Sequence, residues 1–470
     1  MSTMEKEFES KNIESLYKKA EEAAILINQS SHIYLLSHND VDGITSASIM
    51  IQAFERGNIN YDFKPVSIID EKFISSFAET LRSDSLIVFC DIGSGFSKEL
   101  SLISNEIIIL DHHIISPNSP AKIMVNPECF GLDGSYMLCA SGVAYLVAKN
   151  MNELNQNLVP LAIVGMIGDR QLMTSVNALI LDEGIKNGFI KCRYGLKIRD
   201  GDLFYCLLYS IEPYFEITGS RKKVISFLKS LNIYGKKTYE LTDIEMKRLA
   251  DAIQFQLQKT ASSDAIESVI GDICSFPEFQ IKNAIEFAGL LEICWKQHNS
   301  GLAISICKNK RSRNSLKKLY DEYWNSQKEF VKTFEDIYPL VKKRKFFSYF
   351  RLNQHNNVGN FASVYTRYFS PQKPCFCLNV KEKDIKIVAR GTQELLHRGL
   401  NLSQALQEVV KITGGTGGGH NIAAGASIPL EKEKMFLDKM DEVLEKQIRN
   451  ESDFHTLEST NKSKIFSFKS

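Results

Sequence analysis

The sequence predicts an α/β fold in which a parallel sheet flanked by helices is followed by a helical middle and a second, smaller α/β unit. Three observations support this prediction. Short apolar runs early in the chain each end at acidic or histidine residues, the middle holds long amphipathic stretches with few Gly or Pro, and a glycine-rich segment begins at residue 414. Domains of roughly 100–200 residues are usual, so a chain of 470 residues is expected to form two or three domains.

The N-terminal part of the chain supplies the predicted parallel sheet. Apolar positions in residues 10–28 recur at helical spacing, so this stretch is expected to form the first helix. Further elements are predicted from apolar runs: strands at residues 33–36, 86–90 and 107–110, and helices between the first two strands and at residues 141–151 and 158–167. In open α/β sheets, ligands bind beyond the carboxyl ends of the strands, where acidic and histidine residues cluster in this chain.

The middle of the chain is expected to be mostly helical and carries clusters of basic residues. Its amphipathic stretches lie at residues 221–231, 242–258 and 316–338, and its Lys and Arg clusters at residues 221–223, 236–237 and 308–318. These clusters either contact nucleic-acid phosphates or form ordinary solvated helix faces, and the sequence favours neither explanation.

A second α/β unit is expected from about residue 345. It is predicted to contain strands at residues 346–352 and 386–389, a helix at 402–411 and a glycine-rich loop at 414–419. We therefore expect four regions, at residues 1–175, 176–344, 345–449 and a flexible polar tail at 450–470.

Composition excludes several classes of protein. The 57 basic residues nearly cancel the 56 acidic ones, which argues against a protein coated in positive charge but leaves room for a local basic groove. The ten cysteines are spread along the chain, with only Cys375 and Cys377 close together, so reduced thiols are expected. No window of about 18 apolar residues is present, and the first residues lack the apolar stretch of a signal peptide. We therefore expect no membrane span and a cytoplasmic location.

Potential metal ligands gather after the first predicted strand. His38, Asp40 and Asp42 lie within five residues, and Gly43 lets the chain turn tightly beside them. In a tight loop the two carboxylates can converge on cations. Taken alone, the segment is explained equally well by an exposed turn rich in Asp and Asn.

Three further positions follow apolar runs. Asp91 follows the second predicted strand, Asp111, His112 and His113 follow the third, and Asp169 follows a helix-like stretch. Each has a simpler explanation when taken alone, because a single Asp can cap a helix and adjacent histidines can be paired surface residues. The combination is more informative than any one of them.

The combined set contains the ligands that two cations need. It consists of four carboxylates and two imidazoles, those of Asp40, Asp42, Asp91, Asp169, His38 and His112. Mixed oxygen and nitrogen ligands suit Mn²⁺, with Mg²⁺ or Co²⁺ as alternatives, rather than a thiolate zinc site. So many ligands exceed the needs of one cation, whereas two cations about 3.5–4 Å apart would use them with one Asp bridging. Without cations, converging carboxylates would raise one another's pKa.

The order of these motifs resembles motifs I to IV of the DHH phosphoesterases. The matching segments are His38-Asn39-Asp40-Val41-Asp42-Gly43, then Asp91, then Asp111-His112-His113, then Gly168-Asp169, with Val125-Asn126-Pro127 similar to the segment between motifs III and IV. Downstream, residues 414–426 resemble the signature of the associated DHHA1 domain. This resemblance implies a DHH domain and a DHHA1 domain on two sides of a cleft.

Within this family the chain is most similar to archaeal RecJ-like nucleases. The segment Asp42-Gly43-Ile44-Thr45-Ser46 resembles their motif I, and the likeness extends to about residue 440. One departure concerns His38, which lies two residues before Asp40, whereas several family members place this histidine four residues before the first Asp.

The resemblance implies a role for each residue of the metal site. Asp91 is expected to bridge two cations, with His38 and Asp40 on one of them. Asp42, His112 and Asp169 are expected mainly on the other. Catalytic roles then fall to His113, which would stabilise the phosphoryl oxygens while an activated water attacks phosphorus, and to Asp111 behind it.

The resemblance also implies substrate contacts. The backbone N–H groups of Gly417, Gly418 and Gly419 are expected to approach phosphate oxygens, because glycine has no Cβ to hinder them. Charge-assisted hydrogen bonds are expected from His420 and Arg390, although a surface ion pair is the alternative for Arg390. Asn126 is placed among the substrate contacts as well.

These expectations describe a metal-dependent exonuclease that acts on single-stranded DNA or RNA, in replication or repair. Two alternatives stay open. One is a phosphodiesterase for short oligoribonucleotides or cyclic dinucleotides. The other is a replisome scaffold bound to a GINS-like complex, a partner that a nuclease of this type could also have.

Overall fold

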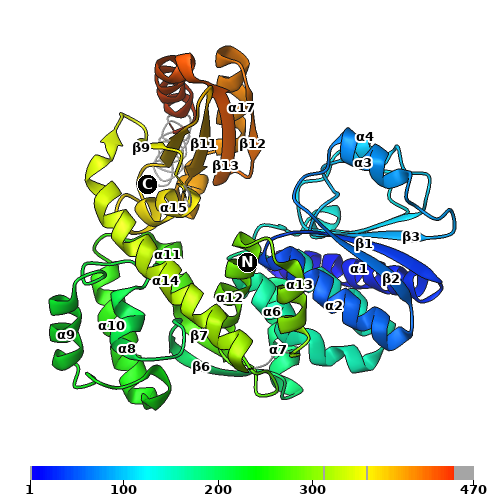
Figure 1. Cartoon of the computed structure of the whole chain (residues 1–470), viewed down its shortest axis with the longest axis horizontal. Coiled ribbons are helices and arrows are strands. Elements are labelled where there is room, and N and C mark those ends of the chain that lie inside the picture. The colour runs from blue at the N-terminus through cyan, green and yellow to red at the C-terminus, as the bar shows by residue number, and fades with distance from the viewer. Residues whose placement is uncertain (1–2, 311–312, 356–357, 449–470) are drawn as a thin grey trace, which may run out of the picture. The chain divides into compact units, whose positions relative to one another are not determined.

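The computed structural model describes residues 3–310, 313–355 and 358–448 (Figure 1). The chain divides into two units, one formed by Met1–Arg193 with Asp272–Trp324 and the other by Tyr194–Gly271 with Asn325–Ser470. The tail predicted at 450–470 lies outside the described residues. None of the helices among the described residues is both long and apolar enough to cross a membrane.

The first unit contains a parallel sheet of five strands in the order β2-β1-β3-β4-β5. The strands are β1 (His32–His38), β2 (Asn60–Val66), β3 (Leu86–Cys90), β4 (Ile107–Leu110) and β5 (Ile123–Val125). All neighbouring pairs run parallel. The three strands predicted from apolar runs are confirmed, and the two strands that the sequence did not predict lie at the edges of the sheet.

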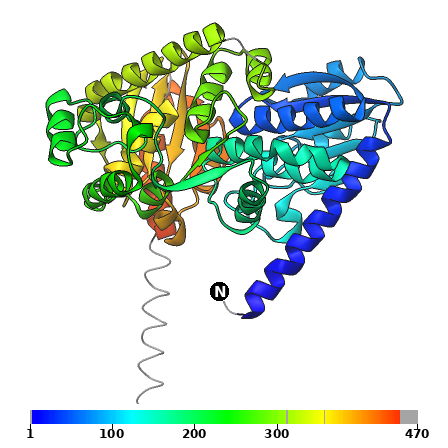
Figure 2. The ribbon, with the colours of Figure 1, turned by 90° about the horizontal axis from the view of Figure 1, so that it is seen from below.

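Alternate side chains of the central strands face two different hydrophobic cores. Leu35, Val88 and Ile108 contact a core that includes residues of the helices α1 (Thr3–Asn28), α2 (Val41–Gly57), α5 (Ala140–Met151) and α6 (Val159–Gly168). Leu36 and Phe89 instead contact a core with α3 (Glu71–Ala78) and α4 (Ser97–Leu100). The sheet is therefore covered on both faces. Figure 2 shows α1, the dark blue helix, from its side.

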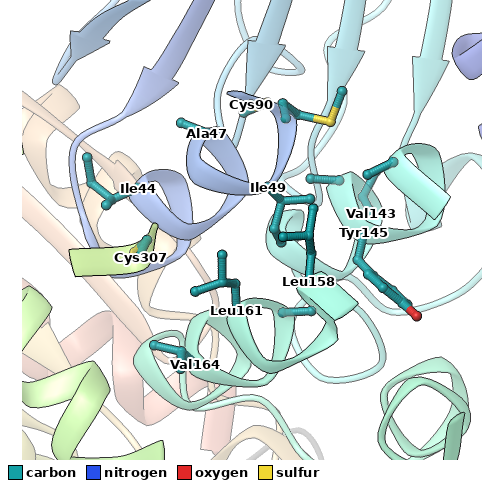
Figure 3. Close-up of a cluster of buried hydrophobic side chains, with 14 of the residues drawn as sticks. Ile44, Ala47, Ile49, Cys90, Val143, Tyr145, Leu158, Leu161, Val164 and Cys307 are labelled. Carbon is teal, nitrogen blue, oxygen red and sulfur yellow. The ribbon is translucent and has the colours of Figure 1, made fainter. Parts of the chain in front are cut away.

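The larger core holds the beginning of α2 firmly in place. Ile44 and Ala47 of α2 lie among Val143 of α5 and Leu161 of α6, all almost completely buried (Figure 3). This unit also contains α7 (Ser175–Lys186), α12 (Ala284–Lys296) and α13 (Ser300–Cys307). Burying an apolar side chain of this size contributes about 1.5–3 kcal/mol, so the residues just before α2 have a rigid support.

The helical middle predicted from the sequence is confirmed, but its residues are shared between the two units. Its helices in the second unit are α8 (Leu203–Leu208), α9 (Arg221–Ser230), α10 (Asp243–Leu257) and α11 (Ser263–Val269). The long helix α14 (Arg313–Ile337) continues from one unit into the other. The sequence did not predict the paired strands β6 (Lys191–Leu196) and β7 (Ile270–Ser275), within which the chain leaves the first unit and returns to it.

The second unit contains a sheet of six strands in the order β12-β13-β11-β10-β9-β8. They are β8 (Lys342–Lys343), β9 (Ser348–Asn353), β10 (Cys375–Val380), β11 (Asp384–Arg390), β12 (Thr416–Gly419) and β13 (Ala423–Pro429). They are accompanied by α15 (Val358–Tyr368), α16 (Gln393–His397) and α17 (Leu402–Thr413), and by a further helix over residues 433–448. Short 3-10 helices lie at Pro127–Phe130, Glu153–Leu158, Thr238–Glu240, Tyr338–Leu340 and Leu430–Lys432.

The glycine-rich segment corrects one prediction. Residues 416–419 were expected in a loop, but they form β12, an edge strand that pairs with β13. Gly417 lies opposite Ala426 and Gly418 lies opposite Gly425, so two strands of very small residues pair closely. Backbone pairing with β13 therefore overrides the low strand propensity of glycine.

Candidate metal centre

The predicted ligands meet at the carboxyl end of the first sheet. His38 is the last residue of β1, Asp91 follows β3 and His112 follows β4. Asp40 and Asp42 lie at the beginning of α2, and Asp169 immediately follows α6. Residues that are 131 positions apart, from His38 to Asp169, are thus brought to one place by the sheet topology.

Three groups of potential ligand atoms each lie within 4.8 Å of one another. One is formed by His38, Asp40 and Asp91, and a second by Asp42, His112 and Asp169. Asp91, Asp111, His112 and His113 form the third, so the assignment of each residue to one of two cations stays a prediction.

Asp91 faces the first two groups with different oxygens. Its Oδ2 lies 3.5 Å from His38 Nδ1, and its Oδ1 lies 3.3 Å from His112 Nε2. The residue has a left-handed backbone conformation, with φ of 59°, and its side chain is 2% exposed. Asp tolerates this conformation better than most residues, and such strain is typical of functional sites.

The two carboxylates of α2 are fixed by backbone N–H groups. Asp40 caps α2 by accepting a hydrogen bond from Gly43 N at 3.0 Å. Asp42 caps a different helix, α5, because its two oxygens accept hydrogen bonds from Ala140 N at 2.8 Å and Ser141 N at 3.0 Å. The positive end of the α5 dipole thus stabilises the Asp42 carboxylate.

Gly43 allows these carboxylates to lie beside the strand end. A Cβ at this position would lie 2.2 Å from the carbonyl oxygen of His38, so any other residue would push α2 away from β1. The close approach brings Asp40 Oδ2 to 2.9 Å from His38 Nδ1.

His112 is oriented by a backbone carbonyl. Its Nδ1 donates a hydrogen bond to the oxygen of Gly134 at 2.7 Å, which leaves Nε2 toward the carboxylates. His112 Nε2 lies 3.9 Å from Asp42 Oδ2 and 3.8 Å from Asp169 Oδ2. A backbone partner of this kind fixes the tautomer that can bind a cation.

Asp111 holds the second histidine of the pair. Its carboxylate is completely buried and accepts hydrogen bonds from Ser94 N at 3.0 Å, His112 N at 2.8 Å and His113 Nδ1 at 2.7 Å. The side chain of His113 is 38% exposed, and its Nδ1 lies 3.8 Å from Asp91 Oδ1. Asp111 therefore positions His113 at the edge of the centre.

Carboxylates crowded away from water dominate the electrostatics of the centre. Burial, together with the charges of Asp40 and Asp42, raises the pKa of Asp91 to about 7. Burial also raises the pKa of Asp169 to about 6. The His112 imidazole opposes this shift and the charge of Asp42 adds to it. Burial would lower the pKa of His38, but Asp40 and Asp91 outweigh it and raise that pKa to about 11.

The residues fit a pair of divalent cations. His38 Nδ1 and Asp91 Oδ2 are buried, and among the described residues neither makes a hydrogen bond of normal geometry, although charged atoms lie 2.9–3.5 Å away. Buried polar atoms of this kind are costly unless something binds them. Carboxylate oxygens and imidazole nitrogens form the donor set that Mn²⁺ or Mg²⁺ accepts, and cations there would offset the repulsion between carboxylates.

Asn126 is placed behind the centre rather than at its surface. It is fully buried, and its Nδ2 donates to Ser94 Oγ and to the carbonyl oxygen of His113, each at 2.9 Å. Its Oδ1 accepts from Glu128 N at 2.9 Å. The sequence led us to expect a contact between Asn126 and substrate. The structure instead uses the Asn126 amide to hold the loop that carries His113.

The predicted phosphate-binding residues lie together in the second unit. Arg390 ends β11 and pairs with Ala423, whose carbonyl oxygen accepts a hydrogen bond from His420 N at 2.8 Å. Gly417 and Gly418 are half-buried, and Gly419 is exposed. The structure thus places Arg390, His420 and the glycines on or beside the adjoining strands β11, β13 and β12, which form one side of the six-stranded sheet.

Sequence reasoning missed the groups that orient the ligands. Gln171 Nε2 donates to Asp169 Oδ2 at 2.9 Å and to the oxygen of Gly134 at 2.8 Å, so one side chain supports two ligands. The N–H groups of Ala140 and Ser141 and that of Ser94 act through the backbone, which leaves no signature in side-chain chemistry. Only the position of Gln171, two residues after Asp169, gave a signal.

Comparison with known proteins identifies two domains. The DHH family N-terminal domain matches residues 32–166, and the DHHA1 domain matches residues 359–446. The first match contains every predicted metal ligand except Asp169, and the second contains the glycine-rich strand with Arg390 and His420.

Two relatives extend this result. Uncharacterized protein MJ0831 of Methanocaldococcus jannaschii is 30% identical over 448 residues, which cover 93% of this chain and 99% of that protein. The single-stranded-DNA-specific exonuclease RecJ of Bacillus subtilis is also 30% identical, over 205 residues that cover 40% of this chain and 25% of RecJ.

Two solved structures have a similar fold. RecJ of Thermus thermophilus in complex with Mn²⁺ gives a TM-score of 0.58 at 16% identity, over 91% of this chain and 55% of that one. CDC45 of Entamoeba histolytica gives a TM-score of 0.60 at 14% identity, over 92% of this chain and 98% of that one. As its motifs predicted, the chain belongs to the DHH family, carries a DHHA1 domain, and is a homologue of the RecJ exonucleases.

Proposed function

We propose that this protein is a metal-dependent exonuclease that hydrolyses phosphodiester bonds of single-stranded nucleic acid. One observation carries the proposal. The two oxygens of Asp91 face two separate ligand groups, as a carboxylate must if it is to bridge a pair of cations. The name of the Bacillus subtilis relative, a single-stranded-DNA-specific exonuclease, supports the substrate class.

The residues of the chain divide the work in this proposal. One cation would be held by Asp40 and His38. The other would be held by Asp42, His112 and Asp169, and Asp91 would contact both. Two divalent cations in these positions would acidify a water molecule for attack on phosphorus and offset the charge of the phosphoryl group.

The histidine beside the ligands would act on the substrate itself. Asp111 accepts the Nδ1 hydrogen of His113, which favours the protonated imidazole and leaves its other N–H to donate to a phosphoryl oxygen. Asp111 thus acts as a positioning residue for His113. Arg390, His420 and the N–H groups of β12 would bind phosphates elsewhere on the strand.

Labelled substrates test this proposal. The full-length protein is incubated with DNA and RNA single strands labelled at either end, and with the matching duplexes, in the presence of Mn²⁺. Stepwise shortening of single strands is expected, with no cleavage in EDTA and recovery when excess Mn²⁺ is added. Full activity in EDTA would contradict the two-cation mechanism, and cleavage of cyclic dinucleotides alone would contradict the substrate.

A second candidate function is supported by the likeness to CDC45. In this alternative the chain would act as a binding partner within a replication complex, such as a GINS-like one. The complete ligand set favours catalysis, since a scaffold has no need of four converging carboxylates. Replacing Asp91 by Asn separates the two, because a scaffold would keep its cellular function while a nuclease would lose it.

A further inference from the structure

Two cysteines that are 82 residues apart in the sequence meet on paired strands. Cys192 lies on β6 and Cys274 on β7, and their Sγ atoms are 3.2 Å apart. Both residues belong to the first unit. Figure 1 labels the two strands, which lie side by side.

The strand register places the two side chains directly opposite each other. Lys197 N donates to the oxygen of Val269 at one end, and Ser275 Oγ donates to the oxygen of Lys191 at the other, so the strands run antiparallel. Counting inward from either contact brings Cys192 opposite Cys274. In antiparallel strands, pairs that exchange backbone hydrogen bonds alternate with pairs that do not. Lys197 and Val269 form a hydrogen-bonded pair, so Cys192 and Cys274, five positions further along, form a pair of the other kind. In such pairs the opposing Cα atoms are about 4.5 Å apart. That separation lies within the range that disulfides require.

One thiol of the pair is accessible and the other is not. Cys192 is half-buried, whereas Cys274 is 5% exposed. Cys375 and Cys377, the pair that is close in sequence, are both completely buried in β10. A small oxidant can therefore reach Cys192 first, and the buried partner lies within reach of it.

We propose that Cys192 and Cys274 form a reversible disulfide, with a small-molecule disulfide such as oxidised glutathione as the oxidant. The Cys192 thiolate attacks one sulfur of oxidised glutathione and releases one glutathione thiolate. The Cys274 thiolate then attacks Cys192 Sγ, which forms the Cys192–Cys274 bond and releases the second glutathione. The two cysteines are oxidised and the glutathione disulfide is reduced. The two protons lost by the cysteines end on the two released glutathione thiolates.

The disulfide would close the segment that lies between the two strands. The chain leaves the first unit after Arg193 and returns at Asp272, so the bond would tie the two ends of residues 194–271. A cross-link across so long a loop restricts the unfolded chain more than the folded one. The contact between the thiols, which lowers the pKa of Cys192, also favours it as the attacking group. The inference does not depend on nuclease activity.

The experiment uses the full-length protein in buffers with graded ratios of reduced to oxidised glutathione. Digestion without reductant, followed by mass spectrometry, is expected to yield a peptide pair joined through Cys192 and Cys274. The thermal unfolding midpoint is expected to rise by roughly 5 °C on oxidation. Cys192→Ser and Cys274→Ser should each abolish both effects, whereas Cys129→Ser, which removes an exposed cysteine, should abolish neither.

Absence of the joined peptide in oxidising buffer would overturn the proposal, as would a joined peptide that persists in Cys192→Ser. A joined peptide with an unchanged midpoint in the wild-type protein would overturn the stabilising effect on residues 194–271. Limited proteolysis provides a second readout. Fragments cut within that segment should stay joined without reductant and separate when it is added, in the wild type and in Cys129→Ser alone.

Discussion

The metal centre and the glycine-rich edge of the second sheet are built in opposite ways. In the metal centre, the carboxylates of Asp42 and Asp111 are almost completely buried and each is fixed by two or more N–H donors. At the glycine-rich edge, the predicted contacts are half-buried or exposed, and β12 ends the sheet with one side unpaired by any strand among the described residues. A cation needs ligands at fixed positions, whereas a nucleic-acid strand of variable sequence needs a surface that can adapt to it. Changes in the metal centre should therefore abolish activity, and changes at the edge should reduce it by degrees.

The largest effect is expected for Asp91→Asn. The substitution removes the charge that faces both ligand groups but keeps the shape of the side chain and its tolerance of a left-handed backbone. Turnover should fall by orders of magnitude, and bound Mn²⁺, measured by elemental analysis, should fall with it. Asp84→Asn is the matched control, because it removes the same charge at an exposed position of the same unit. Undiminished turnover of Asp91→Asn would refute the bridging role.

His113→Ala tests whether a residue at the edge of the metal centre acts on substrate alone. Loss of one donor to a developing oxyanion typically lowers kcat by about 10²–10³-fold. That loss is expected here with both cations retained, as measured by turnover alongside metal analysis. If His113→Ala removes a cation, the residue is a ligand and the ligand sets must be redrawn.

Arg390→Ala and His420→Ala test the other side of the comparison. Losing one charge-assisted hydrogen bond costs about 1.5–3 kcal/mol, so kcat/KM should fall by about 10- to 150-fold with metal content unchanged. Lys386→Ala is the control, since it removes an exposed cation from the same strand, β11. If kcat/KM were the same in all three variants, Arg390 and His420 would not bind the nucleic-acid strand.

The smallest effect on turnover is expected for Asn126→Ala. Removing the amide leaves the carbonyl of His113 and the N–H of Glu128 without this partner, which should lower the free energy of unfolding by about 1–3 kcal/mol. Denaturant unfolding measures this change, and kcat should fall less than in His113→Ala. A loss of substrate affinity without any loss of stability would restore the substrate contact expected from the sequence.

The parts of the fold that the sequence predicted are those with a strong side-chain pattern. The apolar runs of β3 and β4 gave their bounds directly, and the motif residues that follow them led to the metal centre. By contrast, β2 is an edge strand with mostly exposed side chains and a proline, and β5 is three residues long. The strand formed by glycines had no side-chain pattern to detect. The buried run of β10 did carry an apolar pattern, interrupted by two cysteines and an asparagine.

The same contrast holds within the metal centre. The candidate ligands were predicted from Asp and His in a characteristic order, whereas the orientation of these side chains depends on backbone donors and acceptors. The carbonyl of Gly134 and the N–H groups at the start of α5 are invisible in a sequence, since every residue has them.

The capping of α5 by Asp42 has a consequence for metal exchange. Because the first turn of that helix already stabilises one of the clustered carboxylates, the fold does not depend on cations alone to tolerate them. The protein should therefore stay folded whether or not cations occupy the candidate centre. Such a centre would bind whichever divalent ion combines abundance with high affinity for mixed oxygen and nitrogen donors. In that order of affinity, Mn²⁺ is the weakest of the common transition metals. Its occupancy would then report the ion supply of its surroundings, and a chain of the same sequence prepared in different media would differ in metal while keeping one fold.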